Sequence, residues 1–142
     1  MSSPNDNPES KFVPNSFQTP NPYVDQYLAF LTCEQWKILT YAIRRILGFQ
    51  KREDRISLSQ FHNGLTNDKG EALDYGTGLS VSTCKKCLED LVRYGLMVRL
   101  DDNNPANEGI LWGLQWDSTQ VNDDEIMADY EARKQMMGGR SE

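Results

Sequence analysis

The segment from Gly78 to Val98 holds the side chains whose types and spacing point most directly to a chemistry. Ser80 can cap a helix, and apolar residues follow it at helical spacing, namely Val81, Cys84, Leu88, Leu91 and Val92. The opposite face carries Ser82, Thr83, Lys85, Lys86, Glu89 and Arg93. In a winged helix-turn-helix, short hydroxyl and basic side chains near the start of the second helix of the motif face the major groove. The segment therefore predicts a DNA-recognition helix, although an ordinary amphipathic helix has the same pattern.

A second group of reactive side chains favours a structural role. Cys84 and Cys87, with Cys33 and His62 elsewhere, could supply four zinc ligands, but the pair falls on the inner face of the expected helix, where small buried thiols are common. His62 is the only histidine, and the sequence offers it no nucleophile to activate. We therefore expect no catalytic site, no metal and no cofactor, and a protein that is not an enzyme.

Length and charge set the limits of these interpretations. The 142 residues suffice for one domain with tails. Apolar runs fall far short of the roughly 20 residues of a membrane span, and the first residues lack the features of a signal peptide, so we expect a cytoplasmic protein with reduced thiols. The net charge of −6 is uneven, because residues 31–100 hold eleven Lys/Arg against eight Asp/Glu and residues 101–142 hold three against ten. A weakly basic domain with an acidic tail remains compatible with a nucleic-acid partner.

The expected architecture is an α+β, mostly helical, winged helix-turn-helix with a two-stranded wing and a C-terminal helix. Residues 1–22, rich in Ser, Pro and Asn, predict an extended or disordered arm; residues 23–118 form the winged-helix domain, and residues 119–142 an acidic tail with one helix. Thr32 and Ser57 each begin a capping box, which predicts a helix ending at Gly48 and a short helix ending near Asn63 and Gly64. A basic polar connection, residues 50–55, joins them.

The remaining segments complete this architecture. The connection of residues 66–77 exceeds the usual three or four residues and predicts a small hairpin or a surface loop. Residues 96–100 and 110–116 predict the wing strands. We expect the three tryptophans in the core or in strands, because a platform for single-stranded DNA needs exposed aromatics among basic residues. In the tail, the narrow apolar stripe after Asn122 predicts a helix that docks on the domain, pairs with another copy, or frays.

The order of several motifs along the chain is distinctive. Leu31–Leu39 precedes the run Gly48-Phe49-Gln50-Lys51, which is followed by Asp54-Arg55-Ile56-Ser57-Leu58-Ser59-Gln60-Phe61 and then by Gly76–Ser80. In order and spacing, residues 12–100 resemble the N-terminal domain of the phage replication protein O family. The resemblance implies a winged-helix domain that binds repeated sites in a replication origin, usually as a homodimer, and acts with a replicative helicase or its loader.

The resemblance also assigns the candidate DNA-binding residues. On the recognition helix they are Ser80, Ser82, Thr83, Lys85 and Lys86, and the candidate phosphate contacts before it are Lys51, Arg52 and Arg55. The acidic, Asn-rich wing loop predicts no phosphate contact there. The expected function is double-stranded DNA binding by a replication initiator. A winged-helix transcription regulator, and a winged helix that binds a protein partner instead of DNA, are the alternatives.

Overall fold

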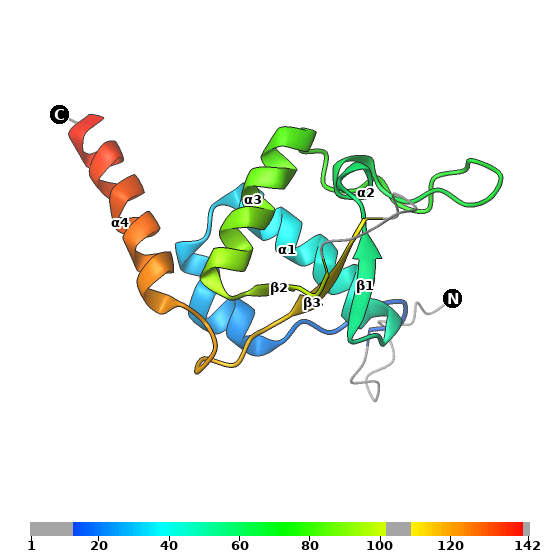
Figure 1. The fold of residues 1–142 in the computed structure, drawn as a ribbon, viewed down its shortest axis with the longest axis horizontal. Helices are drawn as coiled ribbons and strands as arrows, with labels where there is room; N and C mark the ends of the chain where they lie inside the picture. The colour runs from blue at the N-terminus through cyan, green and yellow to red at the C-terminus, as the bar shows by residue number, and fades with distance from the viewer. Residues whose placement is uncertain (1–12, 102–108, 141–142) are drawn as a thin grey trace, which may run out of the picture.

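A computed structural model describes residues 13–101 and 109–140, except for the side chains of residues 138–140. Its elements, in chain order, are the short helical turns η2 (Tyr23–Tyr27) and η3 (Leu28–Phe30), α1 (Cys33–Ile46), η4 (Leu47–Phe49), β1 (Glu53–Ile56), α2 (Leu58–Asn63), α3 (Val81–Tyr94), β2 (Met97–Arg99), β3 (Ile110–Leu114) and α4 (Asp123–Arg140). The fold is α+β, with a small antiparallel sheet beside α1, α2 and α3 (Figure 1).

Both predicted capping boxes are confirmed. Thr32 Oγ1 accepts from the Gln35 backbone N–H at 3.1 Å, and Gln35 Oε1 accepts from the Thr32 N–H at 2.9 Å. Ser57 and Gln60 repeat this exchange at the start of α2. Each box satisfies two backbone donors that a helix start otherwise leaves free, so four residues suffice to fix where the helix begins. The first helix ends at Ile46, and η4 follows it, rather than continuing to Gly48.

The sheet has one strand more than the sequence predicted. The wing strands β2 and β3 pair antiparallel as expected, with Met97 opposite Leu114. Residues 53–56, assigned to a polar connection, instead form β1, which pairs with the other side of β3 and gives the order β1-β3-β2. This strand lies at the edge of the sheet and ends in a single buried residue, Ile56, so it shows no hydrophobic alternation. Its pairing partner lies more than 50 residues away, and local pattern cannot report it.

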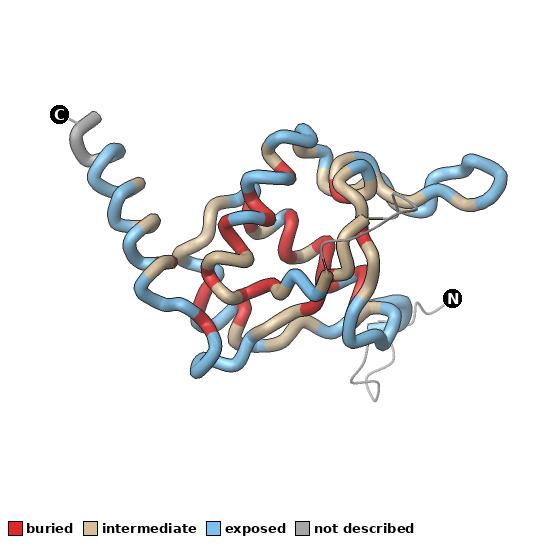
Figure 2. Tube along the Cα trace, viewed as in Figure 1, coloured by how far each residue is buried: buried red, intermediate tan, exposed pale blue. Residues whose placement is uncertain are grey.

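The core lies between α1, α3 and the sheet (Figure 2). Helix α1 contributes Ile38, Leu39, Ala42, Ile43 and Ile46, and α3 contributes Cys84, Cys87, Leu88, Leu91 and Tyr94. Val81 does not join this face as predicted, because the first residue of α3 lies beyond the core and is 45% exposed. Trp112 is buried on β3 and Trp36 packs at the core edge, whereas Trp116 follows the strand and is 37% exposed.

The long connection between α2 and α3 projects from the body as a loop with a fixed base (Figure 1). Thr66 and Ala72 form an isolated antiparallel bridge. The carboxylate of Asp74 accepts hydrogen bonds from the backbone of Leu65 at 3.3 Å and from the hydroxyl of Tyr41 at 3.1 Å. Of the two predicted alternatives, the segment is a surface loop whose strand pairing is limited to this bridge, and its base is tied to α1.

Helix α4 is partly integrated with the domain. Ile126 is buried in the common core, and the Tyr130 ring meets Phe30 edge to face at 5.1 Å between centroids. Met136 and Met137, two turns further on, are each 69% exposed. Docking, one of the three predicted alternatives, describes the first half of the helix, and the second half extends away from the body (Figure 1).

Candidate nucleic-acid interface

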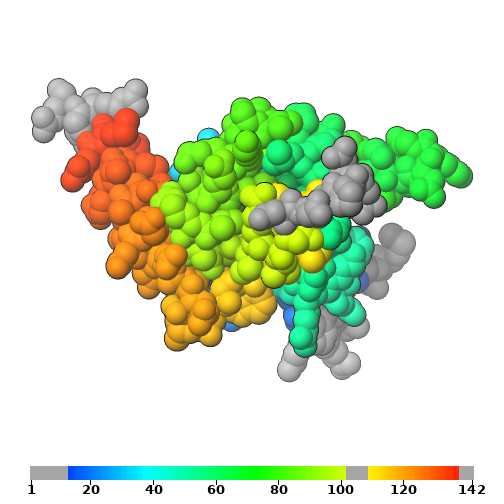
Figure 3. Space-filling view, in the orientation of Figure 1, coloured from blue at the N-terminus to red at the C-terminus, as the bar shows by residue number. Residues whose placement is uncertain are grey.

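Helix α3 is fixed at both ends, so its outer face is presented in one orientation. At its start, Ser80 Oγ accepts from the Thr83 backbone N–H at 3.2 Å. At its end, Gly95 takes a left-handed conformation, φ +78°, and its N–H reaches the carbonyls of the last turn. A Cβ at this position would lie 2.8 Å from the Gln120 carbonyl oxygen, so glycine also permits the close approach of the segment before α4. In Figure 3, α3 occupies the centre of one face, between the loop after α2 and α4.

The first turn of α3 gathers hydroxyl groups at the surface. Ser80 Oγ lies 3.2 Å from Ser82 Oγ and donates to Thr83 Oγ1 at 2.9 Å. The positive end of the helix dipole and the free N–H groups of the first turn lie at the same place, an environment that favours a phosphate or another anion. Three of the predicted site residues are therefore brought together at one exposed helix end.

The lysines of α3 differ in their surroundings. Lys85 is exposed and has no acidic or hydrogen-bonding partner in the described part of the chain. Lys86 Nζ lies 2.9 Å from Asp90 Oδ1, one turn further along, and this hydrogen bond raises the pKa of Lys86. The charge of Lys86 is thus partly neutralised within the helix, although its side chain remains 72% exposed. Lys85 is the better candidate for an external anion.

The last basic residue of α3 is held by acids. Arg93 lies 3.0 Å from Asp90, 3.2 Å from Glu125 and 2.6 Å from Asp129, the last two on α4. Its hydrogen bond to Asp129 is the main reason that the pKa of Arg93 is raised further above its ordinary value. Arg93 therefore connects α3 to α4 and is not available to an external phosphate in this arrangement.

The three candidate phosphate contacts before α3 are spread along the sheet. Lys51 Nζ lies 3.3 Å from Asp54, and Arg55 Nη2 lies 2.5 Å from Asp101. Arg52 is exposed and has no ion pair within the described ranges. Because β1 runs toward α2, Lys51 and Arg52 lie at the end of the sheet far from the hydroxyl cluster of α3 (Figure 1). The structure therefore does not gather all eight predicted residues into one site.

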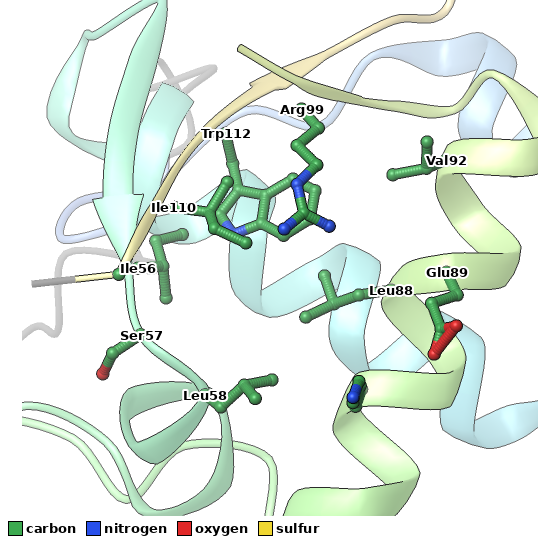
Figure 4. A pocket seen from close by; sticks show the side chains of 11 residues that line it. Ile56, Ser57, Leu58, Leu88, Glu89, Val92, Arg99, Ile110 and Trp112 are labelled. Carbon is green, nitrogen blue, oxygen red and sulfur yellow. The ribbon is translucent and has the colours of Figure 1, made fainter. Parts of the chain in front are cut away.

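Beside α3 lies a groove that the sequence did not reveal (Figure 4). Its volume is about 680 Å³, and it separates α3 from the sheet. The apolar side chains that line it are Ile56, Leu58, Leu88, Val92, Ile110 and Trp112. Lys85 and Glu89 line it from α3, and Arg99 from β2. Its residues come from β1, α2, α3, β2 and β3, so no local motif marks it. Its apolar walls do not resemble a phosphate site.

The cysteines divide into two environments. Cys84 and Cys87 are buried, as predicted, whereas Cys33 is exposed at the start of α1. Burial raises the pKa of Cys84 and raises that of Cys87 to about 11. Within the described ranges, no group of three or more His, Cys, Asp and Glu side chains has the arrangement of a metal site. His62 Nδ1 lies 2.6 Å from the Leu79 carbonyl oxygen and so links α2 to the entry of α3.

Comparisons of the chain with protein-family models, with curated proteins and with solved structures returned no match. Among the described residues, no helix combines the length and the hydrophobicity needed to span a lipid bilayer. The functional interpretation therefore depends on the geometry of α3 and its surroundings, together with the sequence motifs.

Proposed function

We propose that this chain is a winged-helix domain that binds double-stranded DNA through α3, as part of a phage-type replication initiator that recognises origin repeats. The arrangement of elements supports this proposal, because two consecutive helices, α2 and α3, are followed by the β2–β3 hairpin in the place of a wing. The resemblance of the motif order to that of the phage replication protein O family supports the role in replication.

The observation that carries the proposal is the first half of α3. Ser82 and Thr83 lie at an exposed helix start, and Lys85 follows one turn later without an acidic partner in the described structure. Short hydroxyl side chains can approach base edges, while a lysine reaches a phosphate or a guanine. The helix is also held firmly from behind by the core, so little conformational entropy would be lost on binding.

A second function is favoured by a specific observation, the internal neutralisation of basic residues. Lys51, Arg55, Lys86 and Arg93 each pair with an Asp or Glu of the same chain. A winged helix that binds a protein would need no free cations on this face, and the apolar groove beside α3 would suit such a partner. A transcription regulator would use the same residues of α3 as an initiator does.

The proposal is tested by letting the protein select its own site. The full chain is incubated with duplex fragments of the genome that encodes it, and the retained fragments are sequenced and footprinted. An initiator protects repeated sites clustered in one region, and a plasmid carrying that region replicates only when the protein is supplied. Protection of isolated sites before genes would favour a transcription regulator. Retention of no duplex above a shuffled control would contradict DNA binding and favour the protein-interaction role.

A further inference from the structure

A second surface, on α1 and the segment before η2, has a chemistry of its own. The guanidinium of Arg44 lies between two phenylalanine rings, with its Cζ atom 4.4 Å from the ring centroid of Phe49 and 5.7 Å from that of Phe17. Phe49 is 53% exposed and Phe17 is 37% exposed. Phe17, Arg44 and Phe49 are here called the Arg44 clamp. Its two rings still present apolar surface to the solvent while they hold a cation between them.

The backbone around the Arg44 clamp is shaped to hold it. A Cβ at Gly48 would lie 2.7 Å from Arg44 Nη1, so a larger residue there would displace the end of the Arg44 side chain from this position. On the other side, Asn15 adopts a left-handed conformation, φ +54°, and Ser16 donates a hydrogen bond to the Val13 carbonyl. This turn directs the chain so that Phe17 meets Arg44. A hollow of about 620 Å³ remains, lined by residues 15–17, Arg44, Gly48 and Phe49.

The charge of Arg44 is not satisfied within the described chain. Among the described residues, no carboxylate lies within ion-pair distance of its guanidinium and no side chain or backbone group accepts a hydrogen bond from it. In this it differs from Arg45, its neighbour, which is buried and bound to Asp54 at 3.1 Å. Arg52, three residues after Phe49 in the sequence, is also exposed and has no ion pair among the described residues. The segment therefore combines exposed aromatic residues with arginines that have no acidic partner in the described part of the chain.

From this combination we propose that the Arg44 clamp binds single-stranded DNA, with unpaired bases stacked on Phe49 and Phe17 and the phosphate backbone held by Arg44 and Arg52. Bases are flat and stack on aromatic rings in any sequence, and arginine both stacks and pairs with phosphate. An acidic peptide would satisfy the cations but would leave the ring faces without a matching group. The site is separate from α3, so it stands or falls independently of duplex binding.

The experiment measures fluorescence anisotropy of a labelled oligothymidylate of about ten nucleotides, titrated with the full-length protein at moderate salt. The Phe49→Ala and Arg44→Ala variants should each weaken binding by about tenfold, since one stacked base or one phosphate contact is lost. Phe49→Trp preserves a stacking surface and should bind at least as tightly as the parent. Tyr75→Ala is the matched control, because Tyr75 is an 82% exposed aromatic residue on the loop after α2.

Further measurements distinguish binding through bases from binding through phosphates, and binding at the Arg44 clamp from binding at α3. An abasic strand of the same length should bind more weakly than oligothymidylate, because it offers phosphates without bases. The Lys85→Ala variant should bind oligothymidylate like the parent, so that a failure of duplex binding at α3 is distinguishable from a failure here. The proposal is overturned if oligothymidylate does not bind, if Phe49→Ala equals Tyr75→Ala, or if the abasic strand binds equally well. Binding of an acidic peptide in its place, lost in Arg44→Ala, would also overturn it.

Discussion

Replacing Asp129 by asparagine should loosen α4 from the domain. The carboxylate accepts from Arg93 at 2.6 Å and from the hydroxyl of buried Tyr94 at 2.5 Å. Both donors bond the same oxygen, Oδ2, so asparagine, which has nearly the same shape, can still accept from them through its amide oxygen but removes the negative charge that faces Arg93. A hydrogen bond to a charged group contributes about 1.5–3 kcal/mol. Because the Arg93 and Asp129 side chains are 38% and 32% exposed, solvent screening reduces the expected loss to about 1–2 kcal/mol.

The effect should depend on pH in a defined direction. The hydrogen bond from Arg93 is the main reason that the pKa of Asp129 is lowered in the folded protein. The contribution of Asp129 to stability is therefore complete above the ordinary aspartate pKa of about 4 and is lost as the pH falls through the lower folded pKa. The difference in unfolding free energy between the parent and Asp129→Asn should be constant near neutrality and should shrink below about pH 4.

Urea denaturation followed by tryptophan fluorescence measures this difference, with Glu131→Gln as the control. Glu131 is an exposed acid on the same helix, and within the described structure it has no hydrogen bond or ion pair. We expect the control to change stability by less than about 0.5 kcal/mol. Equal stabilities of Asp129→Asn and Glu131→Gln at pH 7 would refute the conclusion that the Arg93 cluster holds α4 in place.

Four further outcomes are expected from the packing and the cysteine environments. In the native protein, Cys33 should react rapidly with a thiol reagent, while Cys87, which is buried and has a pKa of about 11, should stay protected. Elemental analysis should find no stoichiometric zinc. Gly76→Ala should lower the unfolding free energy by about 2 kcal/mol or more, because φ is +68° and a Cβ would lie 2.6 Å from a backbone nitrogen at the base of the loop. Truncation after Thr119 should lower the melting temperature, since it removes the buried side chain of Ile126; an unchanged melting temperature would show that the tail is not part of the core.

The features that sequence predicted well are those set by neighbouring residues. The capping boxes at Thr32 and Ser57 need only four residues each, and the spacing of apolar residues marks the buried face of α3. Strand pairing between distant segments is harder to predict, because residues 53–56 form a strand only by pairing with β3. Val81 shows a further limit, since periodicity assigns a face but does not show where the core ends.

The availability of surface charges was predicted less completely than the fold, because it too depends on contacts between residues that are distant in the sequence. Which lysine of α3 remains free is decided by the Asp90 carboxylate, and the role of Arg93 is decided by acids on α4 more than 30 residues away. The tryptophans do not lie exposed among basic residues, whereas Phe17 and Phe49 lie exposed beside Arg44 in the described structure. Their proximity to Arg44 arises from a turn and a glycine, which composition does not reveal.

The central claim, that α3 binds duplex DNA, is tested most directly by comparing Lys85→Ala with Lys86→Ala. The dissociation constant of each variant for the best genomic duplex is measured as a function of salt concentration. Lys85 has no acidic partner in the described structure, so its loss should weaken binding by about fivefold or more and lower the salt slope by about one unit. Lys86, already paired with Asp90, should have the smaller effect. If the double variant binds the duplex as tightly as the parent, α3 is not the DNA-binding helix.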